Sequence, residues 1–211
     1  MTTAIVDLGA GNLHSAEKAF QKMAAETGAG RVIVTDRPEQ VAAAGRVVLP
    51  GDGAFPACMA ALHGVPGLAE ALEEAVRMRA RPFLGICIGM QMLATTGHEY
   101  RPTPGLGWIP GEVVAIEPGE GRKVPHMGWN DLRLLRAHPA LGGLRTGDHA
   151  YFVHSWAFRP ADHADLIAEV GYGGPVAAIV GRGNILGTQF HPEKSGRAGL
   201  GMIAGFLSWR P

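Results

Sequence analysis

Short apolar runs that alternate with helix-length segments constrain the fold of this 211-residue chain more than any other feature of its sequence. Each run has the length of a buried strand, and the segments over residues 12–26 and 66–80 carry apolar side chains at helical spacing. The GAGN segment (9–12) ends the first run. Strands separated by helices in this rhythm form a parallel sheet that helices cover on both faces. The predicted strands are residues 3–8, 31–35, 46–50 and 82–86.

The second half of the chain follows a different pattern, because its apolar runs come in close succession with little helix between them. This favours antiparallel strands and hairpins joined to the same sheet, followed by a last amphipathic helix from about Arg197 to Trp209. We therefore predict one α/β domain over residues 1–211: a mostly parallel open sheet flanked by helices, with antiparallel strands added in the C-terminal half. The predicted strands of this half are residues 113–116, 151–158, 166–171, 176–181 and 185–190.

The charge balance and the two cysteines argue against several classes of protein. Lys+Arg and Asp+Glu both number 19, so nothing in the net charge favours nucleic acid as a partner. No apolar stretch has the length of a transmembrane helix, and the N-terminal residues lack the pattern of a secretory signal. Cys58 and Cys87 are too few for a disulfide framework in a chain of this size, which favours a reducing cytoplasm.

The segment G85-I-C87-I-G89 has the form of a nucleophile elbow, in which a reactive side chain lies on a sharp turn from a strand into a helix. Glycines flank such a turn because a Cβ there would clash. A helix that begins at Ile88 would direct its free N–H groups at the sulfur and favour the reactive thiolate, and the Ile88 amide would face an oxyanion. The alternative is that Cys87 is a small buried apolar residue, which is the interpretation we give to Cys58.

A cysteine nucleophile needs a base, and His191 is the best placed of the nine histidines. It follows directly after the apolar run 185–190, so it would lie on the same sheet edge as Cys87 if the two strands are neighbours. Glu193, two residues later, would hold the imidazole in the required tautomer as the third member of a triad. The histidines and cysteines do not have metal-ligand spacing, so we predict no metal.

The elbow and the late His-Pro-Glu together resemble the class I, or triad, glutamine amidotransferases. Longer segments resemble one subclass, the glutaminase subunits of imidazole glycerol phosphate synthase, and this resemblance extends from residue 4 to the last helix. That subclass usually has tyrosine at the position of Leu8, and the position of Asp52 varies in it. The matching segments are AIVDLGAGNLHS (4–15), LPGDGAF (49–55), GICIGMQML (85–93), KVPHMGWN (123–130), YFVHSW (151–156) and TQFHPEKS (188–195).

The resemblance implies a reaction and a partner. Cys87 would attack the side-chain amide of glutamine and expel ammonia. Water would then hydrolyse the glutamyl thioester, with His191 as acid and base and Glu193 orienting it. The ammonia would pass to a (β/α)8-barrel cyclase subunit, which forms imidazole glycerol phosphate in histidine biosynthesis. The resemblance implies no cofactor for this subunit.

The loop over residues 50–53 gains a role from the same resemblance. The backbone amide at Asp52 would join that of Ile88 as a second oxyanion donor, because glycine-like freedom lets a backbone donor approach a carbonyl closely. Gly53 would then lie against the substrate. The alternative is an ordinary turn after Pro50.

Three further side chains are expected to line the glutamine pocket. Gln91 lies one helical turn beyond Cys87, and in the family this glutamine and the acid matching Glu99 help to hold the ammonium and carboxylate groups of the substrate. The alternatives are a helix-cap network for Gln91 and a solvated loop acid for Glu99. His154 would line the same pocket, unless it is a core histidine with its hydrogen bonds satisfied.

A surface for the cyclase is expected around the PHMGWN segment. Methionine and tryptophan are enriched in protein interfaces, although local core packing is the alternative for the tryptophan. The expected interface residues are His126, Met127, Trp129, Asn130 and Lys194.

Two other classes of protein stay open. Another class I amidotransferase, serving pyridoxal phosphate or anthranilate formation, would share the elbow, but the GNLHS and PHMGWN segments do not suit it. A non-catalytic binding subunit or a thiol-redox protein would have no need of Cys87, His191 and Glu193 together.

Overall fold

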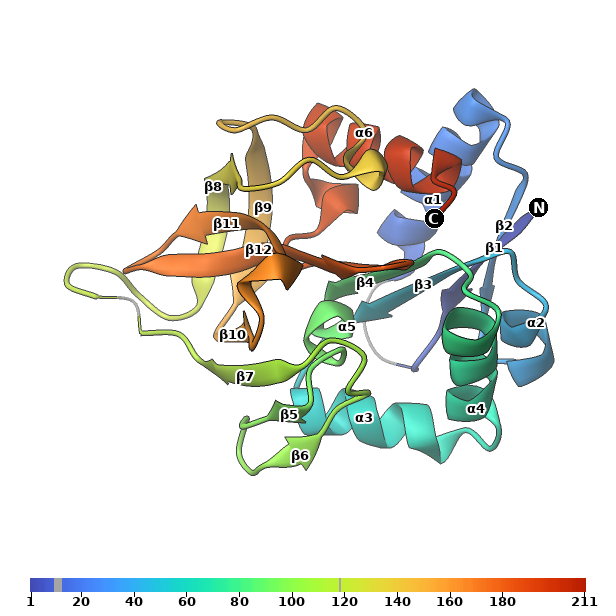
Figure 1. Cartoon of the computed structure of the whole chain (residues 1–211), viewed down its shortest axis with the longest axis horizontal. Coiled ribbons are helices and arrows are strands. Elements are labelled where there is room, and N and C mark those ends of the chain that lie inside the picture. Colours follow the sequence, from blue (N-terminus) through green and yellow to red (C-terminus); the bar gives the residue numbers. More distant parts are fainter. Residues whose placement is uncertain (10–12, 118) are drawn as a thin grey trace.

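The computed structural model of the chain describes residues 1–9, 13–117 and 119–211, and a nine-stranded mixed sheet runs through it (Figure 1). Five neighbouring strands of this sheet are parallel, as the alternation in the sequence predicts. Of the GAGN segment, residues 10–12 lie outside the described residues. In spatial order the parallel strands are β2 (Arg31–Thr35), β1 (Thr2–Val6), β3 (Arg46–Gly51), β4 (Phe83–Cys87) and β13 (Ile185–Thr188).

Helices cover both faces of the parallel strands, and this explains why the central residues of those strands are apolar. Figure 1 shows α1 (Leu13–Thr27) and α6 (Gly196–Ser208) on one face, with α3 (Phe55–Gly64) and α4 (Leu68–Glu73) on the other. Phe20 of α1 meets Phe206 of α6 edge to face, with ring centroids 6.3 Å apart. The short α2 (Pro38–Ala42) packs against α4.

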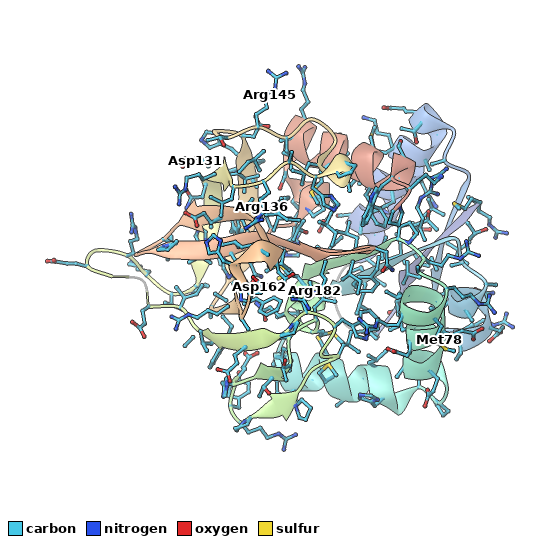
Figure 2. The ribbon with its side chains drawn as sticks, in the orientation of Figure 1. Met78, Asp131, Arg136, Arg145, Asp162 and Arg182 are labelled. Atoms are coloured by element: carbon cyan, nitrogen blue, oxygen red, sulfur yellow. The ribbon has the colours of Figure 1, made fainter. Side chains whose placement is uncertain are left out.

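The helix predicted over residues 66–80 forms in two parts. After α4 the backbone widens into a π-helical turn over Glu74–Met78, where the Arg79 N–H bonds the Glu74 carbonyl five residues earlier (2.9 Å). Met78, at the end of this turn, projects into solvent (Figure 2). Within residues 1–9, 13–117 and 119–211, every helix falls short of the length and apolar character needed to span a bilayer.

The C-terminal half forms strands that divide between two sheets, so the prediction that all of them join one sheet is wrong. Four strands extend the large sheet in antiparallel fashion: β12 (Pro175–Arg182), β11 (Leu166–Gly171), β8 (His126–Leu134) and β9 (His149–His154). A separate four-stranded sheet contains β10 (Trp156–Pro160), β7 (Gly111–Ala115), β5 (Thr96–Gly97) and β6 (Thr103–Pro104). Single 3-10 turns occur at Pro139–Leu141, His163–Asp165 and Pro192–Lys194.

The apolar run 151–158 is the place where the chain passes from one sheet to the other. Predicted as one strand, it breaks at Ser155 into β9 and β10. The Ser155 carbonyl already accepts a hydrogen bond from Ile116 N–H (3.0 Å), which directly follows β7 of the small sheet. The apolar pattern continues through the break, since both halves pack against the interior.

The elbow predicted at the end of β4 depends on a close approach between backbones. A Cβ on Gly89 would lie 1.8 Å from the Leu49 carbonyl oxygen, and one on Gly85 would lie 2.4 Å from the Gly89 carbonyl oxygen. Both separations are far inside van der Waals contact with backbone atoms that cannot move independently. The helix after the elbow, α5 (Ile88–Gln91), begins at Ile88 as predicted and is a single turn long.

We expect Gly89→Ala to lower the free energy of unfolding by about 3 kcal/mol or more, because the methyl group overlaps the Leu49 carbonyl of the neighbouring strand. Gly64→Ala is the matched control: it lies in α3 with no heavy atom within 4 Å of the added Cβ, and alanine there gains helix propensity. Urea unfolding followed by circular dichroism compares the two. Equal stabilities for both variants would contradict the crowding.

Candidate active site

The backbone at Cys87 holds the nucleophile elbow in a conformation that L-residues rarely adopt. Cys87 ends β4 with φ +56° and ψ −112°, and such positions cost about 1–3 kcal/mol unless the surroundings enforce them. Its register partner is Gly51 of β3. The thiol is nearly buried, with 5% of the residue exposed, rather than standing free at the sheet edge.

His191 and Glu193 meet beside this cysteine because β13 and β4 are parallel neighbours. The register pairs Thr188 with Ile86, so the two strand ends coincide, as the triad prediction required. The His191 Nδ1 lies 2.8 Å from Glu193 Oε1, and the ring lines the same cleft as Cys87, close enough to interact with its sulfur. The three predicted triad residues are therefore together in the structure.

The charge state of His191 follows from these two contacts. Burial alone would lower the pKa of His191, but hydrogen bonds to Cys87 and Glu193, together with attraction to both groups, raise it to about 10. An imidazolium beside a sulfur favours thiolate, the nucleophilic form of cysteine. The arrangement can therefore form a nucleophile and hold a proton for a leaving group.

A cleft of about 260 Å³ opens over the cysteine at the junction of the two sheets. Its size suits a small polar metabolite. Every residue predicted for the oxyanion and substrate sites lines it. The lining residues are Asp52, Gly53, Cys87, Ile88, Gln91, Glu99, Pro125, Val153, His154, Ser155, Trp156 and His191.

The predicted oxyanion loop continues a strand rather than forming a turn at Pro50. Pro50 and Gly51 are the last residues of β3, and Gly53 follows with φ +98°. The carbonyl of Asp52 accepts a weak hydrogen bond from the Cys58 thiol (3.4 Å). Burial raises the pKa of Cys58 to about 11, so this second cysteine is a structural thiol, as the sequence indicates.

Glu99 is held rigidly at the cleft. Its Oε2 accepts a hydrogen bond from the Phe55 N–H at the start of α3 (2.7 Å), and the residue is buried. The alternative of a solvated loop acid is therefore wrong. The carboxylate caps the first turn of α3, where a negative charge is favoured, while lining the cleft.

Gln91 belongs to a buried network rather than to a helix cap. Its Nε2 donates to the Trp156 carbonyl (2.9 Å) and to Gln189 Oε1 (3.0 Å). Its Oε1 is buried without a partner among the described residues, which leaves one acceptor for a ligand in the cleft.

His154 lines the cleft and is also a satisfied core histidine, so both expectations for it apply. Its Nδ1 faces the Trp156 carbonyl (2.8 Å), which can only accept, so the proton lies on Nδ1. Its Nε2 then accepts from His126 Nδ1 (2.9 Å), and His126 Nε2 accepts from Asn130 Nδ2 (3.2 Å). Burial lowers the pKa of both histidines to about 4, so both are neutral near pH 7.

The predicted interface residues divide between surface and interior. Met127 and Trp129 are 62% and 58% exposed on β8, so core packing of Trp129 is wrong, and Lys194 is also exposed. His126 lies beneath that surface, stacked against Phe152 and Tyr172, and Asn130 is half-buried.

Two residues beside the site, Gln189 and Ser195, were not predicted from the sequence. Gln189 is fully buried with its amide toward the Cys87 sulfur, 3.8 Å away. Ser195 accepts a hydrogen bond from Tyr151 N–H (3.0 Å) and donates to the His191 carbonyl (2.6 Å), which fixes the segment that carries His191. The available signal was the pair of polar residues at 188–189 that ends an otherwise apolar run.

Comparison with known proteins identifies the family of this chain. The family described as glutamine amidotransferase class-I matches residues 4–207. The chain is 64% identical to imidazole glycerol phosphate synthase subunit HisH of Cereibacter sphaeroides, and 61% identical to the same-named protein of Ruegeria pomeroyi. Both alignments cover 100% of each chain.

Solved structures share the fold at low sequence identity. A crystal structure of a glutamine amidotransferase has a TM-score of 0.72 at 20% identity, covering 96% of this chain and 98% of that one. The structure of PurLQS from Thermotoga maritima has a TM-score of 0.71 at 17% identity, covering 98% and 97%.

The raised pKa of His191 predicts a pH-dependent stability. Because about 10 lies above the ordinary 6.5, the charged ring contributes stability that is fully present below about pH 6.5 and is lost as the pH rises through 10. Glu193→Gln should therefore lower the free energy of unfolding by about 2 kcal/mol at pH 6. The difference from wild type should become smaller toward pH 10, where His191 loses its charge.

Urea unfolding at pH 6, 8 and 10 measures this dependence. Glu39→Gln, which breaks an exposed pair with Arg37, serves as the control and should cost little at each pH. A deficit for Glu193→Gln that stays the same from pH 6 to pH 10 would contradict a charged His191 in the folded chain.

Proposed function

Because the chain belongs to the class I glutamine amidotransferase family, we propose that Cys87, His191 and Glu193 form the triad with which it hydrolyses glutamine. The chain is the glutaminase subunit of imidazole glycerol phosphate synthase, an enzyme of histidine biosynthesis. The names of its full-length relatives favour this subunit over the amidotransferases of pyridoxal phosphate and anthranilate formation. The observation that carries the triad is the contact of one charged imidazole with both a strained cysteine and a buried carboxylate.

The triad accounts for both halves of the reaction. The Cys87 sulfur attacks the side-chain carbonyl carbon of glutamine, the carbon–nitrogen bond breaks, and His191 gives its proton to the departing nitrogen, which leaves as ammonia. His191 then takes a proton from water, whose oxygen attacks the thioester carbonyl. The carbon–sulfur bond breaks, glutamate leaves, and the thiol and imidazole return to their starting state. Glu193 keeps the proton-bearing Nδ1 of His191 fixed throughout.

The cleft supplies groups for the oxyanion and for the amino-acid end of the substrate. We assign the backbone amides of Ile88 and Asp52 to the oxyanion. Gln91 offers its unpaired Oε1 to the substrate ammonium, alongside the Glu99 carboxylate. Gly53 and His154 complete the wall of the pocket.

The chain acts in a complex with the cyclase subunit of the synthase. We propose that this partner is a (β/α)8 barrel, that it receives the ammonia, and that it docks on the outward face of β8, formed by Met127 and Trp129 together with Lys194. His126 and Asn130 point inward and support this face from beneath. Exposed methionine and tryptophan side chains on one strand are typical of such an interface.

We further propose that residues 1–211 act as one glutaminase domain, and that the protein works in the cytoplasm. The family match over residues 4–207 supports the first proposal. The two unpaired cysteines support the second, because free thiols persist in reducing compartments.

Cys87→Ala tests the division of labour between the subunits. In the complex, the glutamine-dependent formation of imidazole glycerol phosphate should fall by more than about a thousandfold, because the nucleophile is lost. With free ammonia at high pH, where NH3 is abundant, the rate should match the wild-type complex. Loss of the ammonia-dependent rate in a normally assembled complex would place Cys87 in the cyclase reaction as well.

Trp129→Ala tests the docking face. The exposed indole should contribute as an interface anchor, so the Kd for the cyclase should rise about tenfold or more by titration calorimetry. Tyr100→Ala removes an aromatic residue that is 85% exposed, outside the proposed interface, and should leave the Kd unchanged. Equal affinities for the two variants would direct the search for the interface to another surface.

A further inference from the structure

Gln189 lies against the nucleophile but outside the cleft. It directly follows β13, is fully buried, and anchors its backbone N–H on the Ala178 carbonyl (2.9 Å). Its side-chain Nε2 lies 3.8 Å from the Cys87 sulfur, within hydrogen-bond range for so large an acceptor. A fully buried amide in a strand-end position is costly unless its polar atoms have partners, so these contacts account for its presence.

The orientation of this amide is fixed by one backbone carbonyl. The Trp156 carbonyl can only accept, so the group of Gln91 that faces it at 2.9 Å must be the NH2. That NH2 uses its second hydrogen on Gln189, whose facing atom must then be Oε1 (3.0 Å). Gln189 therefore directs its NH2, and not its oxygen, at the Cys87 sulfur.

Apart from His191, the surroundings of the Cys87 sulfur do little to stabilise a thiolate. The Val153 carbonyl oxygen lies 4.0 Å from the sulfur and suits a thiol that donates, but it opposes a thiolate. The helix after the elbow is one turn long, so its dipole is weak compared with that of a full helix. His191 supplies a charge, and it must also give its proton to the leaving group. Gln189 is a neutral donor whose protons stay in place through the reaction.

We propose that Gln189 is a catalytic residue that stabilises the Cys87 thiolate through its side-chain N–H, with Gln91 and the Trp156 carbonyl holding the amide in the donating orientation. This deepens the proposed function and rests on Cys87 being the nucleophile. Gln189 acts on the nucleophile alone, whereas Gln91 acts on the nucleophile through Gln189 and also lines the cleft.

The test is the pH dependence of Cys87 alkylation by iodoacetamide, measured on the full chain by peptide mass spectrometry. Gln189→Met keeps the length of the side chain and removes the N–H. We expect the pH of half-maximal alkylation to rise by about one unit, which is about tenfold less thiolate at a given pH, as for loss of one hydrogen bond to a charged group. Gln91→Met should shift it in the same direction by less, because Gln189 remains but can rotate.

Thr188→Val is the matched control. Thr188 precedes Gln189 on the same strand and is equally buried, but its hydroxyl has no hydrogen-bond partner among the described residues. The substitution should leave the alkylation profile unchanged. If Gln189→Met does not fold, as judged by circular dichroism, the shift in Gln91→Met decides the test.

Steady-state glutaminase kinetics in the complex provide the second measurement. Gln189→Met should lower kcat about tenfold with less than a twofold change in KM, because the residue does not touch the cleft, whereas Gln91→Met should also raise KM. A Gln189→Met profile that coincides with wild type overturns the inference. A wild-type Cys87 that reacts no faster than Cys58 overturns the proposed nucleophile instead, so the two failures are distinguishable.

Discussion

The close approach of Gly89 to the Leu49 carbonyl is the constraint on which the rest of the site depends. It lets the chain turn sharply from β4 into α5, and this turn places Cys87 at the floor of the cleft with a positive φ. The neighbouring parallel strands hold this turn in place, because β3 and β13 pair with β4 on either side. The strained backbone is thus stabilised by the most regular part of the fold.

The cleft holds two histidines whose environments give them opposite charge states. Glu193 and the thiol keep His191 protonated, whereas His154 faces a neutral carbonyl and another histidine and stays uncharged. A neutral His154 leaves the imidazolium as a local positive charge directed at the sulfur. The carbonyl of Trp156 orients both His154 and Gln91, so one backbone atom gives the polar wall of the cleft its direction.

The sequence was sufficient to predict the parallel half and to predict that Cys87, His191 and Glu193 lie together, because both depend on local pattern. Alternating strands and helices determine which strand ends coincide, and the G-x-C-x-G and His-Pro-Glu segments lie at those ends. The break at Ser155 was not predictable, because apolar residues continue across two sheets. Gln189 was also missed, because a contact between residues 102 positions apart leaves only a polar residue in an apolar run. Strand β8 lacks the usual alternation in which apolar side chains point inward and polar side chains point outward. Its histidine and asparagine point inward, while its methionine and tryptophan point outward.

The exposed apolar side chains of β8 have a consequence for the concentration of this chain in the cell. A strand that carries its apolar side chains to solvent is a place where copies of the free chain can associate with one another when no partner covers it. The free chain is therefore the form that is prone to aggregate, and matched synthesis of the two subunits would keep its concentration low. Proteolysis of the surplus chain would achieve the same result, so partner abundance would determine the lifetime of this subunit.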